Sequence, residues 1–589
     1  MPARTVFTAL EDTARQYGDA VALYQPSGGK AGRAYRTYSW NEWFRIATEI
    51  GLGLRARGIR KGEIACILSE TRAEFYLTDI GIMAAGGVAA ALYTAYPMPD
   101  LLGNIQSIAP RFLFIENAKS LAELVSLARA EGATLPEHIV LMTGEQTGRT
   151  TLEQLQQTGR QFQDRDPSAL SRMKEELSSD DAAILYLTSG ATGEPKMGLT
   201  SHAAILANVD MAPIALPVGP QDCTIVFLPS AHIAQRIVLE MVPLRTGMPV
   251  WFSESLTRLP SELKSIRPTV FLAPPRVWER MYASILSELK KRPLPLRKVF
   301  HGALGLGLEA ARYQQEGKAI PKWMTRARKA ANKLVFSKIR ERLGGRLRIA
   351  ASGAAPLGKD LAEFFSAIGM PLIEGYGLTE AGILSFNPLE RPRAGSIGKA
   401  LPSVEMRIAE DGELQVRSPC MFMGYYRDEA ATRSVLSEDG WFSTGDIGEV
   451  DEDGYWFITG RKKELIVSSS GKKIYPARIE SLFKMEPVVS QVVLIGDKRP
   501  YMTAILTLNA ANMGNHRDGE KEKAVKDVVA RINKQLADFE RIRRFRVLDR
   551  EFTIERGELT PTMKIRRAQV LENHKDLVSE LYLGREESE

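Results

Sequence analysis

Apolar runs of strand length alternate with helix-like patterns from about Trp40 to Gly395, and this alternation strongly constrains how the 589-residue chain can fold. The pattern is typical of doubly wound layers in which helices cover a parallel sheet. Several runs end in Gly, Ser, Thr or Pro, at strand ends where an open parallel sheet places its ligand-binding loops. The clearest runs are GEIACIL (62–68), AAILYLT (182–188), TIVFLP (224–229), TVFLAP (269–274) and RLRIAAS (346–352).

The last third of the chain has a different pattern, in which short β-type runs replace the alternation. Asp453-Gly454 within it is a strong hairpin-turn signal. A charged, glycine-flanked stretch at 460–464 predicts a domain boundary with a hinge at 461–464. We therefore expect an α/β fold with a large N-terminal domain (1–460) of layered α/β subdomains plus a β-rich subdomain (about 395–460), and a small mobile α+β C-terminal domain (461–589).

Composition places the chain among soluble globular proteins, since 44% of its residues are hydrophobic and 25% are charged. Three scattered cysteines without a CxxC pair argue against a structural zinc site and favour a reducing cytosolic compartment. The N-terminal segment lacks the apolar core of a signal peptide. The best candidate membrane span, Phe75–Tyr96, contains Asp79 and many Gly and Ala, so it predicts a buried helix running into a buried strand. We expect a cytoplasmic protein.

A basic insert at about 288–348 carries most of the positive charge. Between Lys290 and Arg348 there are 17 Lys and Arg but three Glu, while the whole chain has a net charge of +7. Such a patch suits anionic lipid, a polyphosphate or nucleic acid, although no motif supports nucleic-acid binding. With Trp323, Leu334, Val335 and Phe336 interleaved, we hypothesise peripheral docking on an anionic membrane; a solvated helical face is the alternative. The oligomeric state is not predicted.

The segment YLTSGATGEPKMG (186–198) predicts a phosphate-binding loop after a strand. Small residues let backbone N–H groups approach a phosphate, hydroxyls add donors, and a lysine adds a point charge. It is not a Walker A loop, because no Gly-Lys-Ser/Thr follows at the required spacing. A flexible surface loop is the alternative for such a segment taken alone.

Seven blocks in order along residues 186–567 resemble the signatures of the adenylate-forming (AMP-binding) superfamily. They are YLTSGATGEPK (186–196), FLPSAH (227–232), SGAAPL (352–357), EGYGLTE (374–380), GELQVRSP with GY (412–425), GWFSTGD followed by GRKKELI (440–466), and LTPTMKIRR (559–567). APPRVWER (273–280), the basic insert and the C-terminal blocks are most similar to the long-chain fatty acyl-CoA synthetase branch, including its bubblegum type.

The resemblance implies an ATP-dependent acid–thiol ligase. A fatty-acid carboxylate would attack ATP to give acyl-AMP and pyrophosphate, with Mg²⁺ as cofactor, and coenzyme A as co-substrate would then displace AMP. Two alternatives stay open. One is a fatty acyl-AMP ligase that loads a carrier protein, and the other is a catalytically silent acyl- or nucleotide-binding membrane carrier.

The resemblance also implies the site residues. Catalytic roles would belong to Lys564, Thr188, Glu380 and His232, with Thr188 and Glu380 holding Mg²⁺. Lys463 would be the hinge, and Gly471, Lys472 and Lys473 would line the coenzyme A site. The expected ATP/AMP-binding residues are Thr188, Ser189, Gly190, Thr192, Gly193, Lys196, Gly353, Ala354, Ala355, Glu374, Gly375, Tyr376, Gly377, Thr379, Asp446, Ile458, Arg461 and Lys564.

Three residues depart from the superfamily pattern. Met563 stands before Lys564 where many members have Gly, and Met197 stands where Gly usually follows the loop lysine. Arg236 occupies the place of a tryptophan that gates the fatty-acid tunnel in some bacterial long-chain enzymes.

Arg541, Arg543 and Arg544 are further candidate phosphate contacts, although such arginines are not distinctive.

Overall fold

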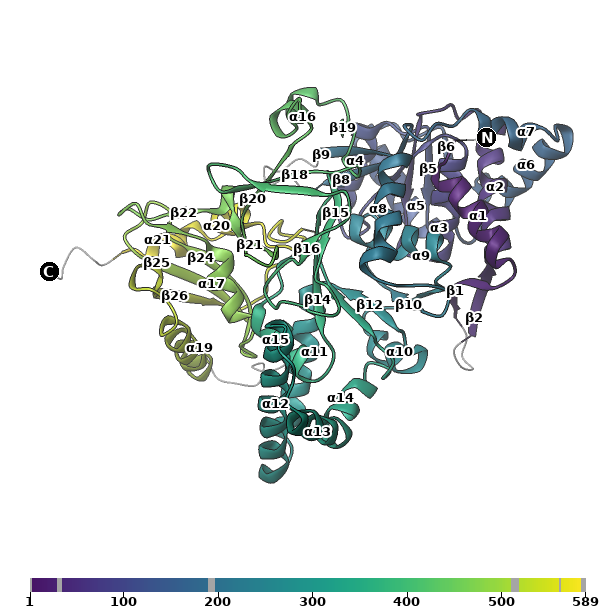
Figure 1. The fold of residues 1–589 in the computed structure, drawn as a ribbon. Coiled ribbons are helices and arrows are strands. Elements are labelled where there is room, and N and C mark those ends of the chain that lie inside the picture. Colours follow the sequence, from purple (N-terminus) through teal and green to yellow (C-terminus); the bar gives the residue numbers. More distant parts are fainter. Residues whose placement is uncertain (1–2, 29–33, 189–195, 510–517, 561–562, 584–589) are drawn as a thin grey trace.

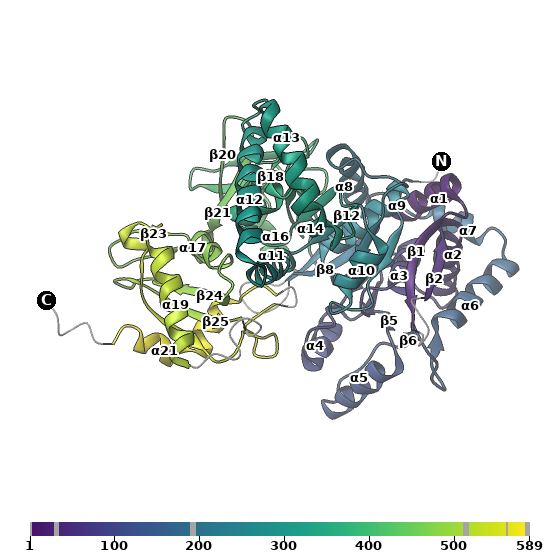
Figure 2. The same ribbon diagram turned by 90° about the horizontal axis from the view of Figure 1, so that it is seen from below.

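The structure is a computed structural model, and it describes residues 3–28, 34–188, 196–509, 518–560 and 563–583. The large N-terminal domain occupies the right and centre of Figure 1, and the C-terminal domain lies at its left. Figure 2 shows the same two parts from below, with the C-terminal domain beside helices α11 and α12. The predicted α/β class with a large and a small domain is confirmed.

One sheet of the N-terminal domain has the strand order β19-β9-β8-β4-β3-β5-β6-β7. Its central strands run parallel, whereas β9 returns antiparallel to β8 and pairs with β19. The predicted strand before the phosphate loop is β8. The strands are β3 (Ile64–Leu68), β4 (Val88–Ala91), β5 (Phe112–Ile115), β6 (His138–Leu141), β7 (Thr150–Thr151), β8 (Ala182–Thr188), β9 (Lys196–Ser201) and β19 (Gly424–Tyr425).

The other large sheet has the order β16-β15-β14-β13-β12-β10-β11-β1-β2. Parallel pairing runs from β1 through β11, β10, β12 and β13 to β14, and β15 then turns back antiparallel. The strands are β1 (Val21–Ser27), β2 (Ala34–Ser39), β10 (Thr224–Val226), β11 (Val250–Phe252), β12 (Val270–Ala273), β13 (Ile349–Ser352), β14 (Leu372–Leu378), β15 (Gly382–Phe386) and β16 (Lys399–Ala400).

Helices fill the space between the two sheets and cover their outer faces. The largest core joins Tyr76 of α3, Ile184 of β8 and Phe252 of β11, and it therefore connects both sheets. Helix α3 is buried, as predicted, and no helix in the described residues is long and apolar enough to cross a membrane. The helices are α1 (Val6–Tyr17), α2 (Trp40–Ala56), α3 (Ala73–Ala84), α4 (Met98–Ile108), α5 (Ala118–Ala130), α6 (Leu152–Arg165), α7 (Ala169–Glu175), α8 (His202–Ala215), the π-helix η1 (Ala234–Met241), α9 (Val242–Thr246), α10 (Leu259–Ile266) and α15 (Lys359–Ala367).

The basic insert is helical and forms the lower end of the molecule in Figure 1. It follows α11 (Pro275–Lys290) and contains α12 (Leu294–Gln315), α13 (Lys322–Ala331), the π-helix η2 (Asn332–Phe336) and α14 (Ser337–Glu341). Trp323 and Leu334 are 64% and 66% exposed, whereas Phe336 is 2% exposed. Of the four apolar residues proposed for membrane docking, Phe336 is therefore not available at the surface, because it packs in a core with Phe271 and Phe300.

The β-rich subdomain is an antiparallel sheet of order β17-β18-β20-β21. The predicted Asp453-Gly454 turn lies between β20 and β21, and Gly454 has φ +79°, which favours glycine. This sheet carries three of the candidate site residues on neighbouring strands, with Asp446 on β20 and Ile458 and Arg461 on β21. Its elements are β17 (Glu405–Ile408), β18 (Glu413–Arg417), α16 (Glu429–Val435), β20 (Phe442–Val450) and β21 (Trp456–Arg461).

The C-terminal domain has its own apolar core around the sheet β24-β25-β26. It contains η3 (Lys462–Glu464), β22 (Ile466–Val467), β23 (Lys473–Ile474), α17 (Pro476–Phe483), β24 (Val489–Ile495), β25 (Met502–Leu508), α19 (Asp518–Asn533), η4 (Asp538–Glu540), β26 (Ile542–Leu548), α20 (Arg567–Asn573) and α21 (Lys575–Glu580). The mixture of helices and a small sheet matches the predicted α+β class.

Candidate active site

A buried carboxylate, Asp446, is held by donors from two different strands. The Tyr376 hydroxyl of β14 donates to its Oδ2 at 2.6 Å, and Arg461 Nε of β21 lies 2.9 Å from its Oδ1. Asp446 itself is 2% exposed. Burial and the neighbouring carboxylate raise the pKa of Tyr376 well above 10, so the phenol remains a donor. The arrangement fixes an acceptor-only group that suits a pair of hydroxyls.

The expected metal ligand Glu380 lies next to the described end of the phosphate loop. Tyr425 donates its hydroxyl proton to Glu380 Oε1 at 2.8 Å, and Lys196 Nζ lies 4.7 Å from the centre of the Tyr425 ring. Lys196 faces Thr188 across the β8–β9 hairpin, and the Thr188 hydroxyl donates to the Lys196 carbonyl at 3.2 Å. Tyr425 lies in the resembling GY block, yet its contact with Glu380 is not predicted by spacing.

Glu380 and Thr188 are the candidate Mg²⁺ ligands. Among the described residues there is no cluster of three or more His, Cys, Asp or Glu side chains that could hold a metal. Glu380 and Thr188 offer one carboxylate and one hydroxyl, which suits a cation held mainly by substrate phosphates and water. One carboxylate and one hydroxyl are therefore compatible with magnesium that is delivered with a nucleotide.

The ends of the phosphate loop are described, but its middle is not. Ser189, Gly190, Thr192 and Gly193 lie outside the described residues. Met197, a departure from the superfamily pattern, pairs with Leu187 in the β8–β9 ladder, and its carbonyl accepts from the Tyr426 amide at 2.7 Å. The unusual methionine is thus accommodated within regular strand pairing.

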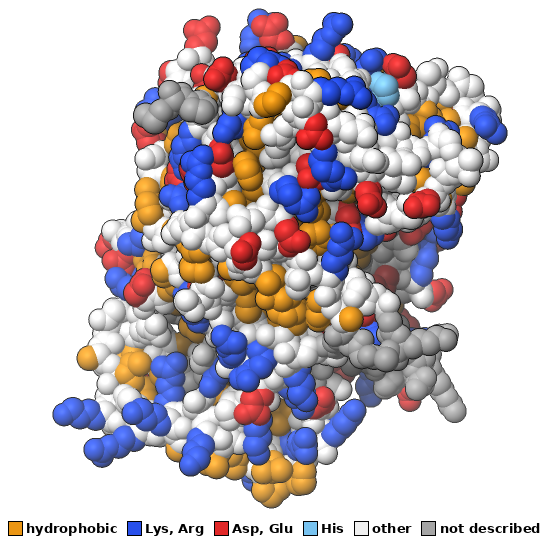
Figure 3. All heavy atoms as spheres, turned by 90° about the vertical axis from the view of Figure 1, so that its right-hand side faces the viewer, with side chains coloured by type: hydrophobic (Ala, Val, Ile, Leu, Met, Phe, Trp, Pro, Cys, Tyr) orange, Lys and Arg blue, Asp and Glu red, His pale blue; other side chains and the backbone are white. Residues whose placement is uncertain are grey.

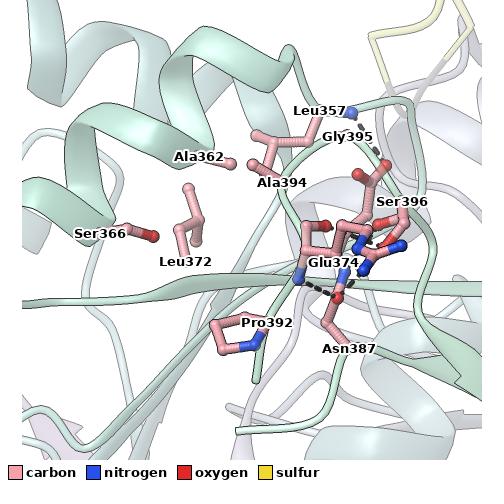
Figure 4. Close-up of a pocket in the computed structure, with 11 residues that line it drawn as sticks. Leu357, Ala362, Ser366, Leu372, Glu374, Asn387, Pro392, Ala394, Gly395 and Ser396 are labelled. Atoms are coloured by element: carbon pink, nitrogen blue, oxygen red, sulfur yellow. Dashed lines mark hydrogen bonds between the residues drawn. The ribbon is translucent and has the colours of Figure 1, made fainter. Parts of the chain in front are cut away.

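The loop 353–357, expected to contact adenine, follows β13 and is anchored from β14. Ala354 in this loop has φ +69°, a conformation that is uncommon for a residue with a side chain. The Glu374 side chain extends toward the loop and accepts from the Leu357 amide at 2.9 Å (Figure 4). Burial raises the pKa of Glu374 to about 8. The Glu374 side chain therefore supports the loop by accepting a hydrogen bond from the loop backbone. Glu374 also lines a small cavity together with Asn387 and Ser396.

Gly375 and Gly377 of β14 have a packing reason to lack side chains. A Cβ on Gly375 would lie 2.4 Å from Phe386 Cε1, and one on Gly377 would lie 2.4 Å from the Gly382 carbonyl oxygen. These glycines let β14 and β15 approach closely beside Tyr376. Besides their predicted role in the nucleotide site, these two glycines are needed for the close packing of β14 against β15. The family resemblance alone does not indicate this packing role.

Lys564 lies opposite Thr560 at the base of a turn in the C-terminal domain. The Thr560 amide donates to the Lys564 carbonyl at 2.8 Å, and the Lys564 amide donates to the Thr560 hydroxyl at 3.0 Å. Met563 in this turn has φ +63°, which explains why glycine would suit the position. The methionine accepts a left-handed backbone that costs about 1–2 kcal/mol for an ordinary residue.

The turn brings Lys564 into the electrostatic neighbourhood of the N-terminal site. Surrounding protein, and then the charge of Arg461, lower the pKa of Lys564 to about 8, while the charges of Asp446, Glu380 and Glu464 oppose this shift. The side chain is nevertheless reached by solvent, as expected for a group that faces an open site. Glu464 acts on Lys564 although sequence reasoning did not select it.

His232 is a partly buried member of the same neighbourhood. Burial, and then the charge of Lys564, lower its pKa to about 3, so the ring is neutral at physiological pH. Its Nδ1 accepts from the Ala234 amide at 3.1 Å, which orients the ring at the start of η1. Arg236, one turn further on, is fully buried and forms an ion pair with Asp79 of α3. It therefore packs inside the domain.

The expected coenzyme A residues belong to a different part of the C-terminal domain. Gly471, Lys472 and Lys473 lie at the β22–β23 hairpin, where Lys472 Nζ is 5.9 Å from the centre of the Phe539 ring. The hinge candidate Lys463 lies in η3, between β21 and β22. Arg541 and Arg543 both pair with Asp538, and Arg544 donates to the Leu583 carbonyl, so these three arginines have partners within the domain.

Two family models cover most of the chain. The model of AMP-binding enzymes matches residues 10–426, and the model of the AMP-binding enzyme C-terminal domain matches residues 463–586. The chain belongs to the AMP-binding enzyme family. The predicted resemblance is confirmed, and the relatives below also support the long-chain and bubblegum-type branch.

Among curated AMP-binding relatives, the long-chain-fatty-acid–CoA ligase FadD15 of Mycobacterium tuberculosis is 33% identical over 556 residues, covering 90% of each chain. The long-chain-fatty-acid–CoA ligase ACSBG2 of Xenopus laevis is 28% identical, covering 99% of this chain and 84% of its own. Among solved structures, the anthranilate CoA ligase AuaEII with anthranoyl-AMP has a TM-score of 0.73 at 18% identity, covering 98% of this chain and 99% of its own. The ATP-bound RpMatB-BxBclM chimera B1 also has a TM-score of 0.73, at 23% identity, covering 98% and 100%. The structural matches establish the fold.

Proposed function

We propose that this AMP-binding enzyme is a long-chain fatty acid–CoA ligase that works through acyl-AMP. The observation that carries the proposal is the buried carboxylate Asp446, which the Tyr376 hydroxyl and Arg461 hold at 2.6 Å and 2.9 Å. The charges of Asp446 and Glu380 act on Lys564 of the C-terminal domain. A cation from one domain is thus added to the acidic and phosphate-loop groups of the other. The curated relatives named as long-chain-fatty-acid–CoA ligases support the choice of acid and thiol.

In the first half-reaction, a carboxylate oxygen bonds to the α-phosphorus of ATP while the bond to pyrophosphate breaks. Asp446 accepts hydrogen bonds from the ribose hydroxyls, and Tyr376 packs beside the base near residues 353–355. Lys564 and Lys196 place positive charge where phosphate oxygens gain negative charge, the main demand of phosphoryl chemistry. Glu380 and Thr188 would hold magnesium, which would supply further charge neutralisation.

In the second half-reaction, the sulfur of coenzyme A bonds to the acyl carbon while the bond to AMP breaks. The proton of the thiol leaves to solvent or a base, and AMP departs as its anion. We assign the β22–β23 hairpin, with Gly471, Lys472 and Lys473, to contacts with coenzyme A after rotation of the C-terminal domain about Lys463. Such a rotation gates the two steps rather than performing chemistry.

The deciding experiment measures palmitate-dependent AMP release with ATP and Mg²⁺, with and without coenzyme A. Release that needs both palmitate and coenzyme A supports the ligase. Palmitoyl-AMP that accumulates to the same extent with or without coenzyme A would instead favour carrier-protein loading, and absence of any turnover would favour the silent carrier. Lys564→Ala is expected to abolish acyl-AMP formation. Lys119→Ala is the matched control, because that lysine is 87% exposed on α5.

We also propose that the basic insert contacts anionic membrane, where a fatty acid partitions. Lys322, Arg326, Lys329 and Lys333 are exposed on the same helical stretch as Trp323 and Leu334. Figure 3 shows Lys and Arg side chains spread over the lower end of the molecule, with hydrophobic side chains among them. Cations attract anionic headgroups, and apolar side chains add burial in the headgroup region.

Vesicle sedimentation tests this membrane contact. We expect binding to phosphatidylglycerol vesicles that weakens with salt and weakens further in Trp323→Ala/Leu334→Ala, but little binding to phosphatidylcholine. Ile214→Ala is the control, because Ile214 is 70% exposed on α8, outside the insert. Vesicle binding that does not depend on lipid charge or salt would contradict membrane contact through the insert. So would an equal loss of binding in Trp323→Ala/Leu334→Ala and in Ile214→Ala. The insert would then be a solvated helical face.

A further inference from the structure

Arg276, at the start of α11, forms hydrogen bonds to the C-terminal domain. One Arg276 N–H group, on Nη1, donates to the Ser490 carbonyl at 2.6 Å, and a second, on Nη2, donates to the Ser490 hydroxyl. That hydroxyl in turn donates to Glu551, so Ser490 is fixed within its own domain. Ser490 is 8% exposed, and the contact is therefore largely shielded from water. Hydrogen bonds from a charged group are stronger than neutral ones.

A second contact beside it involves Lys484, just after α17. Lys484 Nζ donates to the Pro356 carbonyl at 3.3 Å and lies 3.8 Å from Glu279 Oε1. The other Glu279 oxygen is 3.6 Å from Arg276 Nη1. Glu279, whose side chain is 10% exposed, thus lies between one cation from each domain. The two contacts form one connected cluster.

The cluster reaches the nucleotide side of the N-terminal domain through Pro356. Pro356 belongs to the loop 353–357, whose Leu357 amide is held by Glu374. The charge of Lys484 also opposes the burial that raises the pKa of Glu374, which indicates that the two side chains are near each other. The loop 353–357 is therefore contacted both by Glu374 of β14 and by Lys484 of the C-terminal domain.

Resting on the proposed function, we propose that Arg276 and Lys484 are positioning residues for acyl-AMP formation. They hold the C-terminal domain in the orientation that brings Lys564 to Asp446 and Glu380. The chain passes between the domains through η3, a short segment that does not by itself determine orientation. Contacts away from the segment must therefore select one orientation among many.

The proposal predicts different effects on the two half-reactions. If Arg276 or Lys484 loses its contact, the orientation seen here becomes less populated and the rate of acyl-AMP formation falls in proportion. Transfer of the acyl group from preformed acyl-AMP to coenzyme A should be spared, because neither residue is among those assigned to that step. A residue that only stabilised the fold would affect both half-reactions alike.

The test compares Arg276→Ala and Lys484→Ala with Arg280→Ala, an exposed arginine on the same helix. Palmitate-dependent exchange of labelled pyrophosphate into ATP reports the first half-reaction, and palmitoyl-AMP plus coenzyme A reports the second. We expect the first rate to fall roughly tenfold or more, as for a lost charge-assisted hydrogen bond, with the second nearly unchanged. Equal losses in both rates, or no loss in either, would overturn the proposal.

A readout without catalysis separates this proposal from the proposed function. Spin labels at Lys119→Cys on α5 and Lys523→Cys on α19, two exposed positions, report the distance between the domains. We expect one narrow distance distribution that broadens in Arg276→Ala/Lys484→Ala but not in Arg280→Ala. A distribution that stays narrow would refute the positioning role, even if the enzyme prefers an acid other than palmitate.

Discussion

Arg461 and Asp446 face each other across the antiparallel pair β20–β21, with Arg461 Nε 2.9 Å from Asp446 Oδ1. This pairing orients the carboxylate before any ligand arrives, and Tyr376 holds its other oxygen. The Asp446 amide also donates to the Thr444 hydroxyl at 3.1 Å, which fixes the backbone beside it. The β-rich subdomain therefore presents a preorganised acceptor at the edge of the proposed nucleotide site.

Asp446→Asn should weaken ATP binding while leaving the fold intact. Asparagine keeps the size of the side chain but exchanges a carboxylate oxygen for an NH₂ group, which cannot accept from a ribose hydroxyl or from Arg461. Loss of a charge-assisted hydrogen bond costs about 1.5–3 kcal/mol, so the ATP dissociation constant should rise roughly 10- to 150-fold. Calorimetric titration with a non-hydrolysable ATP analogue measures it. Asp180→Asn, at an exposed position, is the control, and an unchanged constant in Asp446→Asn would refute the ribose assignment.

Acyl-AMP formation should weaken as pH rises through about 8. The pKa of Lys564 is lowered to about 8 by surrounding protein and by Arg461, so the side chain carries its charge below that pH and loses it above. Because kcat/KM reports ionisation of the free enzyme, its high-pH limb for ATP should lie near 8. The pH–rate profile of pyrophosphate exchange measures this limb.

Lys564→Arg provides the control for that pH dependence. A guanidinium stays charged throughout this range, so the variant should lose the limb near pH 8 although its rate is lower. The same limb in both proteins would mean that another group titrates. His232 does not account for a limb there, because its pKa is lowered to about 3.

Much of the fold was predictable because it depends on local periodicity. Apolar runs such as 182–188 become buried strands, and the Asp453-Gly454 signal becomes the β20–β21 turn. The contacts between domains were not predictable. Arg276 and Ser490 are far apart in the sequence, and nothing in either segment indicates that the two meet. Contacts of this kind between distant residues depend on how two folded domains pack against each other.

The site shows the same division between local signals and tertiary placement. Motif resemblance selected Asp446, Tyr376 and Arg461, and the structure places them in contact. Resemblance also grouped Glu374 with the nucleotide contacts, whereas its observed partner is the Leu357 amide. The burial of Phe336 within a strongly basic insert is a further example, since a charge run does not tell which of its apolar residues turn inward.

Glu374→Gln should change how stability depends on pH. The folded-state pKa of Glu374 is raised to about 8 by burial, above the value of about 4.3 expected in the unfolded chain. Below both values the carboxyl is protonated in both states, and as pH rises toward 8 the unfolded state alone gains from ionisation. The wild type should therefore lose stability relative to the variant by up to about 1.4 kcal/mol per pH unit between those values.

Thermal unfolding at intervals from pH 5 to pH 9 measures that difference. Glutamine can still accept from the Leu357 amide, so the two proteins should be similar at pH 5 and diverge at higher pH. Lys484 and Arg393 are the charged neighbours of this carboxyl. Curves that remain parallel across the range would show that Glu374 is ionised in the folded protein.

Arg236→Leu should be strongly destabilising, because it leaves a buried carboxylate without its partner. Arg236 and Asp79 are both fully buried, with Arg236 Nε donating to Asp79 Oδ2 at 2.8 Å. Nearby Glu240 is also buried, and burial raises its pKa well above 4.5. A carboxyl group carries no positive charge in either protonation state, so Glu240 cannot replace the lost cation. Removing one partner of a buried pair typically costs about 3–5 kcal/mol. Denaturant unfolding followed by fluorescence measures the loss.

Two variants separate the ion pair from simple loss of an arginine. Asp79→Leu/Arg236→Met removes both charges and should be more stable than Arg236→Leu, since no unpaired charge remains in the core. Arg245→Leu removes an arginine whose partner, Asp210, is solvent-exposed, and it should cost no more than about 1 kcal/mol. If the double variant were less stable than Arg236→Leu, the packing of the two side chains rather than their charges would hold η1 against α3.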